Sequence, residues 1–87
     1  MARLRVQGAD AFAFLQRQCM SDLRLLDVDG AIQWSGLLSA KGRMLFLFRL
    51  LRQAEQDFIL LASGSSASDL AAELQRFVLR SKLSIKA

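Results

Sequence analysis

Few side chains in this sequence are suited to acid–base, nucleophilic or metal chemistry. The chain has no histidine and a single cysteine, Cys19. It therefore lacks a histidine general base and a Cys/His zinc set. One thiol forms no internal disulfide and holds no iron–sulfur cluster, which takes about four ligands. Cys19 lies among apolar residues at helical spacing, which predicts a buried core thiol. We expect no catalytic and no metal-binding residue in this chain.

Basic side chains are the other groups that could bind a partner. Twelve Lys and Arg against eight Asp and Glu give a net charge of +4, which suits nucleic acid, phosphate or a small molecule with a polyglutamate-like tail. The same excess fits a solvated surface with a mild basic bias. In residues 39–48, SAKGRMLFLF, Lys41 and Arg43 flank Gly42 directly before an apolar run. Gly42 permits a positive φ at a hairpin tip, where the two cations either stay in water and discourage edge pairing or attract an anionic ligand.

Hydrophobic periodicity predicts the elements that position these residues. Asp10 is expected to cap the first helix, and Ser66 with Asp69 forms an S-x-x-D cap for the second, whose apolar residues recur at helical spacing. The acidic stretch 21–30 is expected to be an irregular link. The expected elements are a strand at 4–8, a helix from 10 to about 20, strands at 31–39, 44–51 and 57–62, a helix at 66–79 and a strand at 82–86.

The order strand-helix-strand-strand-strand-helix-strand predicts an α+β fold. We expect a ferredoxin-like-related sheet of about five strands with two helices on one face, and right-handed crossovers that place the first and last strands inside the sheet. The strand at 44–51 has large apolar side chains on both faces, so the face without helices should be an interface with another domain of a longer chain. The side chains on that face are either Met44, Phe46, Phe48 and Leu50, or Leu45, Leu47 and Leu51 beside Arg49.

Length and composition limit the setting. The chain has 87 residues, of which 53% are hydrophobic and 23% charged, and this composition is typical of one globular domain. No apolar run approaches the roughly 20 residues of a membrane span. The first residues, MARLRVQGAD, contain cations but no apolar core of a signal peptide behind them. We therefore expect a cytoplasmic protein with no membrane contact.

Three ordered stretches resemble a known family. They are GADAFAFLQRQCMSDL at 8–23, AKGRM at 40–44 and SKLSI at 81–85. Together they resemble the amino-terminal part of the YgfZ-type folate-binding proteins, which belong to the superfamily of the glycine cleavage T-protein, an aminomethyltransferase. The resemblance extends over essentially the whole chain. The family's K-G-C-Y-x-G-Q-E signature, which lies further downstream, is absent, as expected if residues 1–87 are one domain, the amino-terminal folate-binding segment of a longer YgfZ-like protein.

The resemblance implies a ligand and a role. The ligand would be tetrahydrofolate or a derivative, bound beside the turn formed by Lys41, Gly42 and Arg43. The T-protein carries an aspartate pair just after the equivalent glycine, whereas this chain has Leu45 and Phe46 there. Aminomethyl transfer is therefore not expected. Members of the YgfZ branch resemble folate-dependent helpers of iron–sulfur proteins that are linked to tRNA modification, so further partners would be iron–sulfur client proteins and the remaining domains of the chain.

Four further residues are candidates for the folate site. Asp22 could hydrogen-bond a pterin ring, or fix the link after the first helix, and Gln18 has the same two interpretations. Trp34 belongs to the core or an interface, or stacks on a base or pterin. Arg49 lies in an apolar strand and must extend to solvent, pair with an acid or face a ligand cavity.

Two other classes of function stay open. A basic ferredoxin-like module could bind RNA, since GRMLFLFR has some likeness to the aromatic central strand of RNA-recognition modules. Their element order differs, because three strands here separate the helices. A structural dimerisation domain would result if the apolar sheet face paired with its own copy.

Overall fold

A computed structural model describes residues 2–62 and 67–86 of the chain. The elements follow the predicted order, with one added turn of 3-10 helix in the acidic link. They are β1 (Ala2–Gln7), α1 (Ala11–Gln18), η1 (Leu23–Leu25), β2 (Ile32–Leu38), β3 (Met44–Ala54), β4 (Asp57–Ala62), α2 (Ala67–Gln75) and β5 (Ser84–Lys86).

The five strands form one sheet in the order β2-β3-β4-β1-β5, with every neighbouring pair antiparallel. Without β2, the order β3-β4-β1-β5 is that of a ferredoxin-like fold, so β2 is the added strand. The predicted fold class is confirmed. One detail was wrong, because β5 is an edge strand instead of an inner one. The crossover through α2 carries the chain over β1 to its far side, where β5 pairs with β1 alone.

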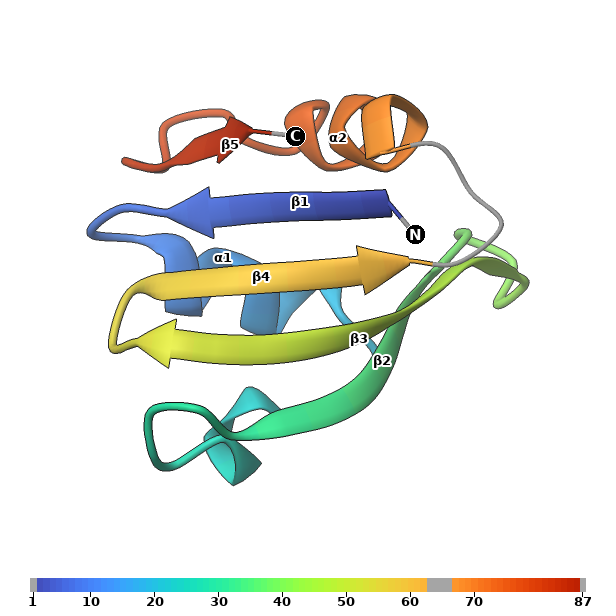
Figure 1. Cartoon of the computed structure of the whole chain (residues 1–87). Coiled ribbons are helices and arrows are strands. Elements are labelled where there is room, and N and C mark those ends of the chain that lie inside the picture. The colour runs from blue at the N-terminus through green and yellow to red at the C-terminus, as the bar shows by residue number, and fades with distance from the viewer. Residues whose placement is uncertain (1, 63–66, 87) are drawn as a thin grey trace.

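Both helices pack on one face of the sheet, as predicted. In Figure 1, α1 lies behind the sheet, and α2 lies at the β1–β5 end. Alternate residues of the strands point to this face and form one core with Phe14, Leu15, Leu70 and Leu74 from the helices. The strand residues of this core, each fully buried or nearly so, are Leu4, Val6, Leu37, Phe48, Leu50, Phe58, Leu60 and Ala62.

The opposite face of the sheet has no helix over it. Of the two alternatives for β3, the structure selects the one with Arg49 for most of the strand, because Phe48 and Leu50 are fully buried whereas Leu47 is 53% exposed. The alternation breaks at the start of β3, opposite the register shift between Leu37 and Leu38. There Leu45 lies on the helix side and Met44 lies beside Trp34 and Leu47, which reverses the prediction for these two residues. Leu51 is half-buried beside Arg49. Successive side chains of a strand point to opposite faces of the sheet, so the apolar run of β3 gives it two apolar faces. The position of the helices decides which of the two faces is covered.

The boundaries of the second helix differ from the sequence prediction. It ends at Gln75 instead of residue 79. The Arg76 amide still donates to the carbonyl four residues earlier, but the amides of Phe77 and Val78 donate to the carbonyls three residues earlier, so the chain tightens into a turn. The predicted cap Ser66 lies outside the described residues.

The turn between β1 and α1 contacts the segment before β5. This contact joins the sequence motif at 8–23 to the motif at 81–85. The Asp10 amide donates to the Lys82 carbonyl (3.1 Å), and the Lys82 amide donates to an Asp10 carboxylate oxygen (2.8 Å). Asp10 stands at the start of α1, but its side chain makes no capping hydrogen bond to that helix. Gly8 has a φ of +142°, and a Cβ there would lie 2.5 Å from both Leu83 Cα and the Lys82 carbonyl oxygen. Glycine at this position therefore permits the close approach of the two segments.

Candidate functional site

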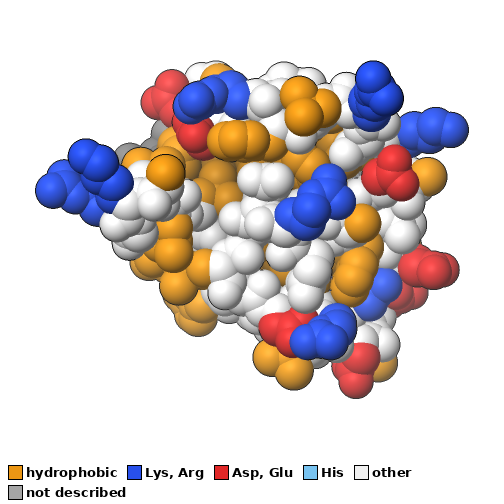
Figure 2. Space-filling view, turned by 180° about the vertical axis from the view of Figure 1, so that it is seen from behind, with side chains coloured by type: hydrophobic (Ala, Val, Ile, Leu, Met, Phe, Trp, Pro, Cys, Tyr) orange, Lys and Arg blue, Asp and Glu red, His pale blue; other side chains and the backbone are white. Residues whose placement is uncertain are grey.

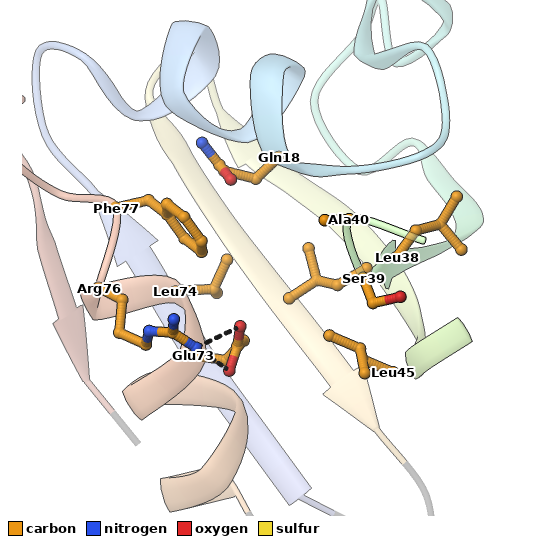
Figure 3. A pocket seen from close by; sticks show the side chains of 10 residues that line it. Gln18, Leu38, Ser39, Ala40, Leu45, Glu73, Leu74, Arg76 and Phe77 are labelled. Carbon is orange, nitrogen blue, oxygen red and sulfur yellow. Dashed lines mark hydrogen bonds and ion pairs between the residues drawn. The ribbon is translucent and has the colours of Figure 1, made fainter. Parts of the chain in front are cut away.

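A cavity of about 410 Å³ lies between the β2–β3 hairpin, the end of α1 and the end of α2. Hydrophobic side chains form most of its wall, and polar atoms come from Gln18, Ser39, Glu73 and Arg76 (Figure 3). In Figure 2, which shows the helix-covered face, hydrophobic side chains are visible in the hollow beside the projecting hairpin. The apolar residues of the wall are Leu37, Leu38, Ala40, Leu45, Leu74 and Phe77.

The two charged side chains of the cavity wall form an ion pair. Glu73 lies on α2, and Arg76 directly follows this helix. Arg76 Nη1 lies 3.1 Å from Glu73 Oε1, and both carboxylate oxygens accept from this nitrogen (Figure 3). The Arg76 side chain is 68% exposed, so its remaining N–H groups are accessible to a ligand. Within the described part of the chain, the side-chain amide of Gln18 makes no hydrogen bond, and it too is available to a ligand.

The hairpin that borders the cavity has a well-defined tip. The Ser39 hydroxyl accepts from the Lys41 amide (3.3 Å) and the Arg43 amide (3.1 Å), and the Gly42 amide donates to the Ser39 carbonyl (2.9 Å). Gly42 has a φ of +81°, which few residues with a side chain adopt. The exposed Lys41 and Arg43 project from this tip and are not part of the cavity wall. Ser39 and Ala40 are the residues of the turn that line it.

Asp22 fixes the link between α1 and β2. Its carboxylate accepts from the Arg24 guanidinium (2.9 Å), from the Gln16 amide (3.0 Å) and from the Arg24 backbone N–H (3.0 Å). The Arg24 guanidinium is the main reason that the pKa of Asp22 is well below its usual range, followed by the hydrogen bond from Gln16. Of the two interpretations of Asp22, the structure favours the one in which it holds the link.

A pH dependence follows from these contacts. A carboxyl whose pKa is depressed in the folded state contributes stability that is present above its unfolded pKa of about 4 and is lost as the pH falls towards the folded pKa. Asp22→Asn should therefore lower the urea midpoint at pH 7, and the difference from the wild type should shrink below about pH 4. The control is Asp27→Asn, which changes an exposed aspartate of the same link. An equal effect of Asp22→Asn at pH 7 and pH 2 would contradict this role.

Trp34 and Arg49 lie on the other side of the sheet from the α1 and α2 helices. They face each other across β2 and β3, and the Arg49 guanidinium carbon is 5.0 Å from the centre of the Trp34 ring. Trp34 is 60% exposed. The seven predicted site residues are thus divided among four places. Gln18 lies in the cavity wall, Lys41, Gly42 and Arg43 lie at its border, Asp22 lies in the link, and the Trp34–Arg49 pair lies on the open face.

Sequence analysis did not find most of the cavity wall. The sequence pattern predicts Arg76 and Phe77 at the end of a longer helix, and Ser39 and Ala40 at the hairpin turn. Nothing local in the sequence identifies them, because their proximity depends on the docking of α2 beside the hairpin. The expectation for Cys19 is met, since its side chain is buried and burial raises the pKa of the thiol to about 12. Within residues 2–62 and 67–86, no three Cys, Asp or Glu residues are grouped as metal ligands.

Comparison with known proteins places this fold. No protein-family model and no curated protein sequence matches the chain. It is similar to the crystal structure of glycine cleavage system aminomethyltransferase T from Bartonella henselae, with a TM-score of 0.86 and 29% sequence identity. The match covers 95% of this chain and 23% of that chain, so the present chain spans about a quarter of that protein's length. The fold is therefore that of the aminomethyltransferase T superfamily, as the sequence resemblance implied. None of the described helices is long and apolar enough to cross a membrane.

Proposed function

We propose that this chain is the amino-terminal folate-binding segment of a longer YgfZ-like protein. In this proposal the full-length protein binds tetrahydrofolate or a derivative and supports the assembly of iron–sulfur proteins, and through them tRNA modification. The observation that carries the proposal is the likeness to an aminomethyltransferase T over 95% of the chain. The motifs at 8–23, 40–44 and 81–85 support the YgfZ branch within that superfamily.

The cavity beside the hairpin suits such a ligand. Its volume of about 410 Å³ lies in the range of about 300–1,000 Å³ that is usual for small-molecule sites. The apolar wall would contact a flat ring system, while the Gln18 amide and the free N–H groups of Arg76 would orient it by hydrogen bonds. When bound, a tetrahydrofolate would supply a one-carbon carrier. The residues named here would only bind and orient it.

Catalysis by this segment is not part of the proposal. Leu45, one of the two residues at the positions of the T-protein's aspartate pair, lines the cavity with an aliphatic side chain. Among the described residues that line the cavity, Glu73 is the one carboxylate, and it is paired with Arg76. No free carboxylate of the wall is therefore placed to take part in aminomethyl transfer. We expect no methylene transfer from an aminomethyl-lipoyl donor, and detectable turnover by the full-length protein would contradict this.

Lys41 and Arg43 should increase the affinity for an anionic ligand. If the tail of a polyglutamylated folate reaches the hairpin tip, each charge-assisted hydrogen bond contributes about 1.5–3 kcal/mol, which is roughly a ten- to hundredfold change in Kd. Titration of the full-length protein should show this loss for at least one of Lys41→Ala and Arg43→Ala. Arg80→Ala, which removes an exposed cation outside the cavity wall, is the control. Equal affinities in all variants would leave the two cations as solvated edge charges, each with an effect below about 0.5 kcal/mol.

The cellular role has its own test. Cells that lack the full-length protein should show lower activity of iron–sulfur enzymes that modify tRNA, and the wild-type chain should restore it. Folate binding without any such deficit would support the binding site and reject the role in iron–sulfur assembly.

A further inference from the structure

The open face of the sheet carries a hydrophobic patch that the cavity does not use. Ile32, Trp34 and Leu47 are 50%, 60% and 53% exposed, and the half-buried Leu51 and Leu61 continue the patch across β3 and β4. The pairing register places these side chains together, because Ile32 is opposite Leu51, and Trp34 and Leu61 are both opposite Arg49. We call these five residues the open-face patch. Exposed hydrophobic side chains at this density mark an interface.

One cation, Arg49, lies within the patch, and Arg3 and Lys86 lie beside it. Arg49 stacks on Trp34, and within the described part of the chain it has no ion pair and no hydrogen bond. Arg3 continues the same cross-strand row on β1, and Lys86 lies in the next row. Arg5 is already neutralised by Asp57, 2.6 Å away. Any surface that covers this face would remove Arg49 from water, and a buried guanidinium needs a carboxylate partner.

These charges make a second copy of the same face a poor occupant. Two such faces in contact would bring Arg3, Arg49 and Lys86 of one copy against the same cations of the other. Asp57, the one acid that the described strand residues place on this face, is already paired with Arg5. Like charges placed together in an interface cost several kcal/mol. A complementary occupant is apolar in its centre and carries carboxylates.

The size of the face indicates which source supplies that occupant. Four strands about 4.8 Å apart, with about six paired residues of about 3.4 Å each, present about 400 Å². Interfaces between domains of one chain bury about 600–1,500 Å² in total, or about 300–750 Å² per side. Specific complexes of separate proteins bury about 800 Å² per partner. The face therefore fits a domain of the same chain better than an independent protein.

We propose that another domain of the same longer chain packs on the open-face patch and supplies a carboxylate to Arg49. This proposal rests on the part of the proposed function that makes the chain a segment of a longer protein. It gives Arg49 and Trp34 a role in domain docking instead of ligand binding. Nucleic acid is the less suitable occupant, because the face has one aromatic ring, and Arg49 already stacks on it.

Hydroxyl-radical footprinting of the full-length protein, read at each residue by mass spectrometry, tests the proposal. Trp34 should be at least tenfold less modified than exposed tryptophan in an unfolded sample, while Leu79, which is 89% exposed here, should be modified freely. Leu47→Asp and Arg49→Glu should each restore modification of Trp34 and increase the radius of gyration in solution scattering. Leu25→Asp, at a 73% exposed position of η1, is the matched control and should do neither. Arg49→Lys, which keeps the charge, separates docking from folding and should leave Trp34 protected.

Each other outcome is decisive. Strong modification of Trp34 in the wild-type protein would overturn the proposal. Protection that disappears on dilution would assign the face to a second copy, and protection that needs added single-stranded RNA would assign it to nucleic acid; both would overturn it. Folate titration of the same sample separates this inference from the proposed function. A protein that binds folate with Trp34 exposed rejects the docking alone, whereas Trp34 protected without folate binding rejects the folate proposal alone.

Discussion

Gly8→Ala is expected to lower the free energy of unfolding by about 3 kcal/mol or more. Two costs add at this position. A residue with a Cβ held in this sparsely populated region of positive φ costs about 1–3 kcal/mol, and φ is +142° here. The new Cβ would also lie 2.5 Å from two backbone atoms, Leu83 Cα and the Lys82 carbonyl oxygen, and forcing such a contact apart costs about 1–3 kcal/mol more. Urea unfolding followed by Trp34, the only tryptophan of the chain, measures the change.

Gly42→Ala is the matched control for this prediction. Gly42 also has a positive φ, +81°, but a Cβ there has open space, with no atom within 4 Å. Its cost should therefore be confined to the backbone strain of about 1–2 kcal/mol. If the two variants unfold at the same urea concentration, the segment before β5 does not press against Gly8, and the contact between the β1–α1 turn and this segment is wrong.

The contact between these two segments also explains why two of the sequence motifs contain these residues. The first motif begins with Gly8 and Asp10, and the third contains Lys82 and Leu83. In the structure, Asp10 and Lys82 hydrogen-bond to each other, and Gly8 lies close against the backbone of Lys82 and Leu83. Their spacing in the sequence therefore records a structural contact, independent of any ligand. Asp22, at the end of the first motif, likewise holds the link after α1.

The sequence was sufficient for the element order and the fold class, because each strand and helix has its own period of apolar residues. It was insufficient where the answer depends on contacts between distant segments. The two faces of β3 are both apolar, so only the docking of α1 and α2 shows that Phe48 is core and Leu47 is exposed. The position of β5 at the edge has the same origin, since local periodicity contains no information on strand order.

The candidate site was only partly predicted for a related reason. The turn at Lys41 and Arg43 was recognised from its cations, and the cavity does lie beside it. The cavity wall, however, combines Gln18, Ser39 and Phe77 from three separate segments. Arg49 is a sequence candidate because it is a cation in an apolar strand, and Trp34 because its ring could stack on a pterin. The alternation of side chains along β2 and β3 places them on the opposite face, where they cannot reach the same ligand.

Filling the cavity gives the sharpest test of the binding site. Ala40 lines the cavity from the hairpin turn, so the indole of Ala40→Trp would occupy space that a ligand needs. We expect at least a hundredfold loss of affinity for tetrahydrofolate in titrations of the full-length protein, equivalent to about 2.7 kcal/mol. The matched control is Ala54→Trp, which adds the same side chain at an exposed position at the opposite end of β3. Both variants should first be shown to unfold at the same urea concentration as the wild type.

The dependence on salt distinguishes this steric effect from that of the hairpin cations. Blocking the cavity removes contacts with the body of the ligand, so the loss caused by Ala40→Trp should be equal at 0.05 M and 0.5 M salt. The loss caused by Lys41→Ala or Arg43→Ala is electrostatic at an exposed site and should shrink as the Debye length falls from about 14 Å to about 4 Å. If Ala40→Trp binds as tightly as Ala54→Trp, the ligand does not enter this cavity. The cations of the hairpin would then act on a ligand held by another part of the chain.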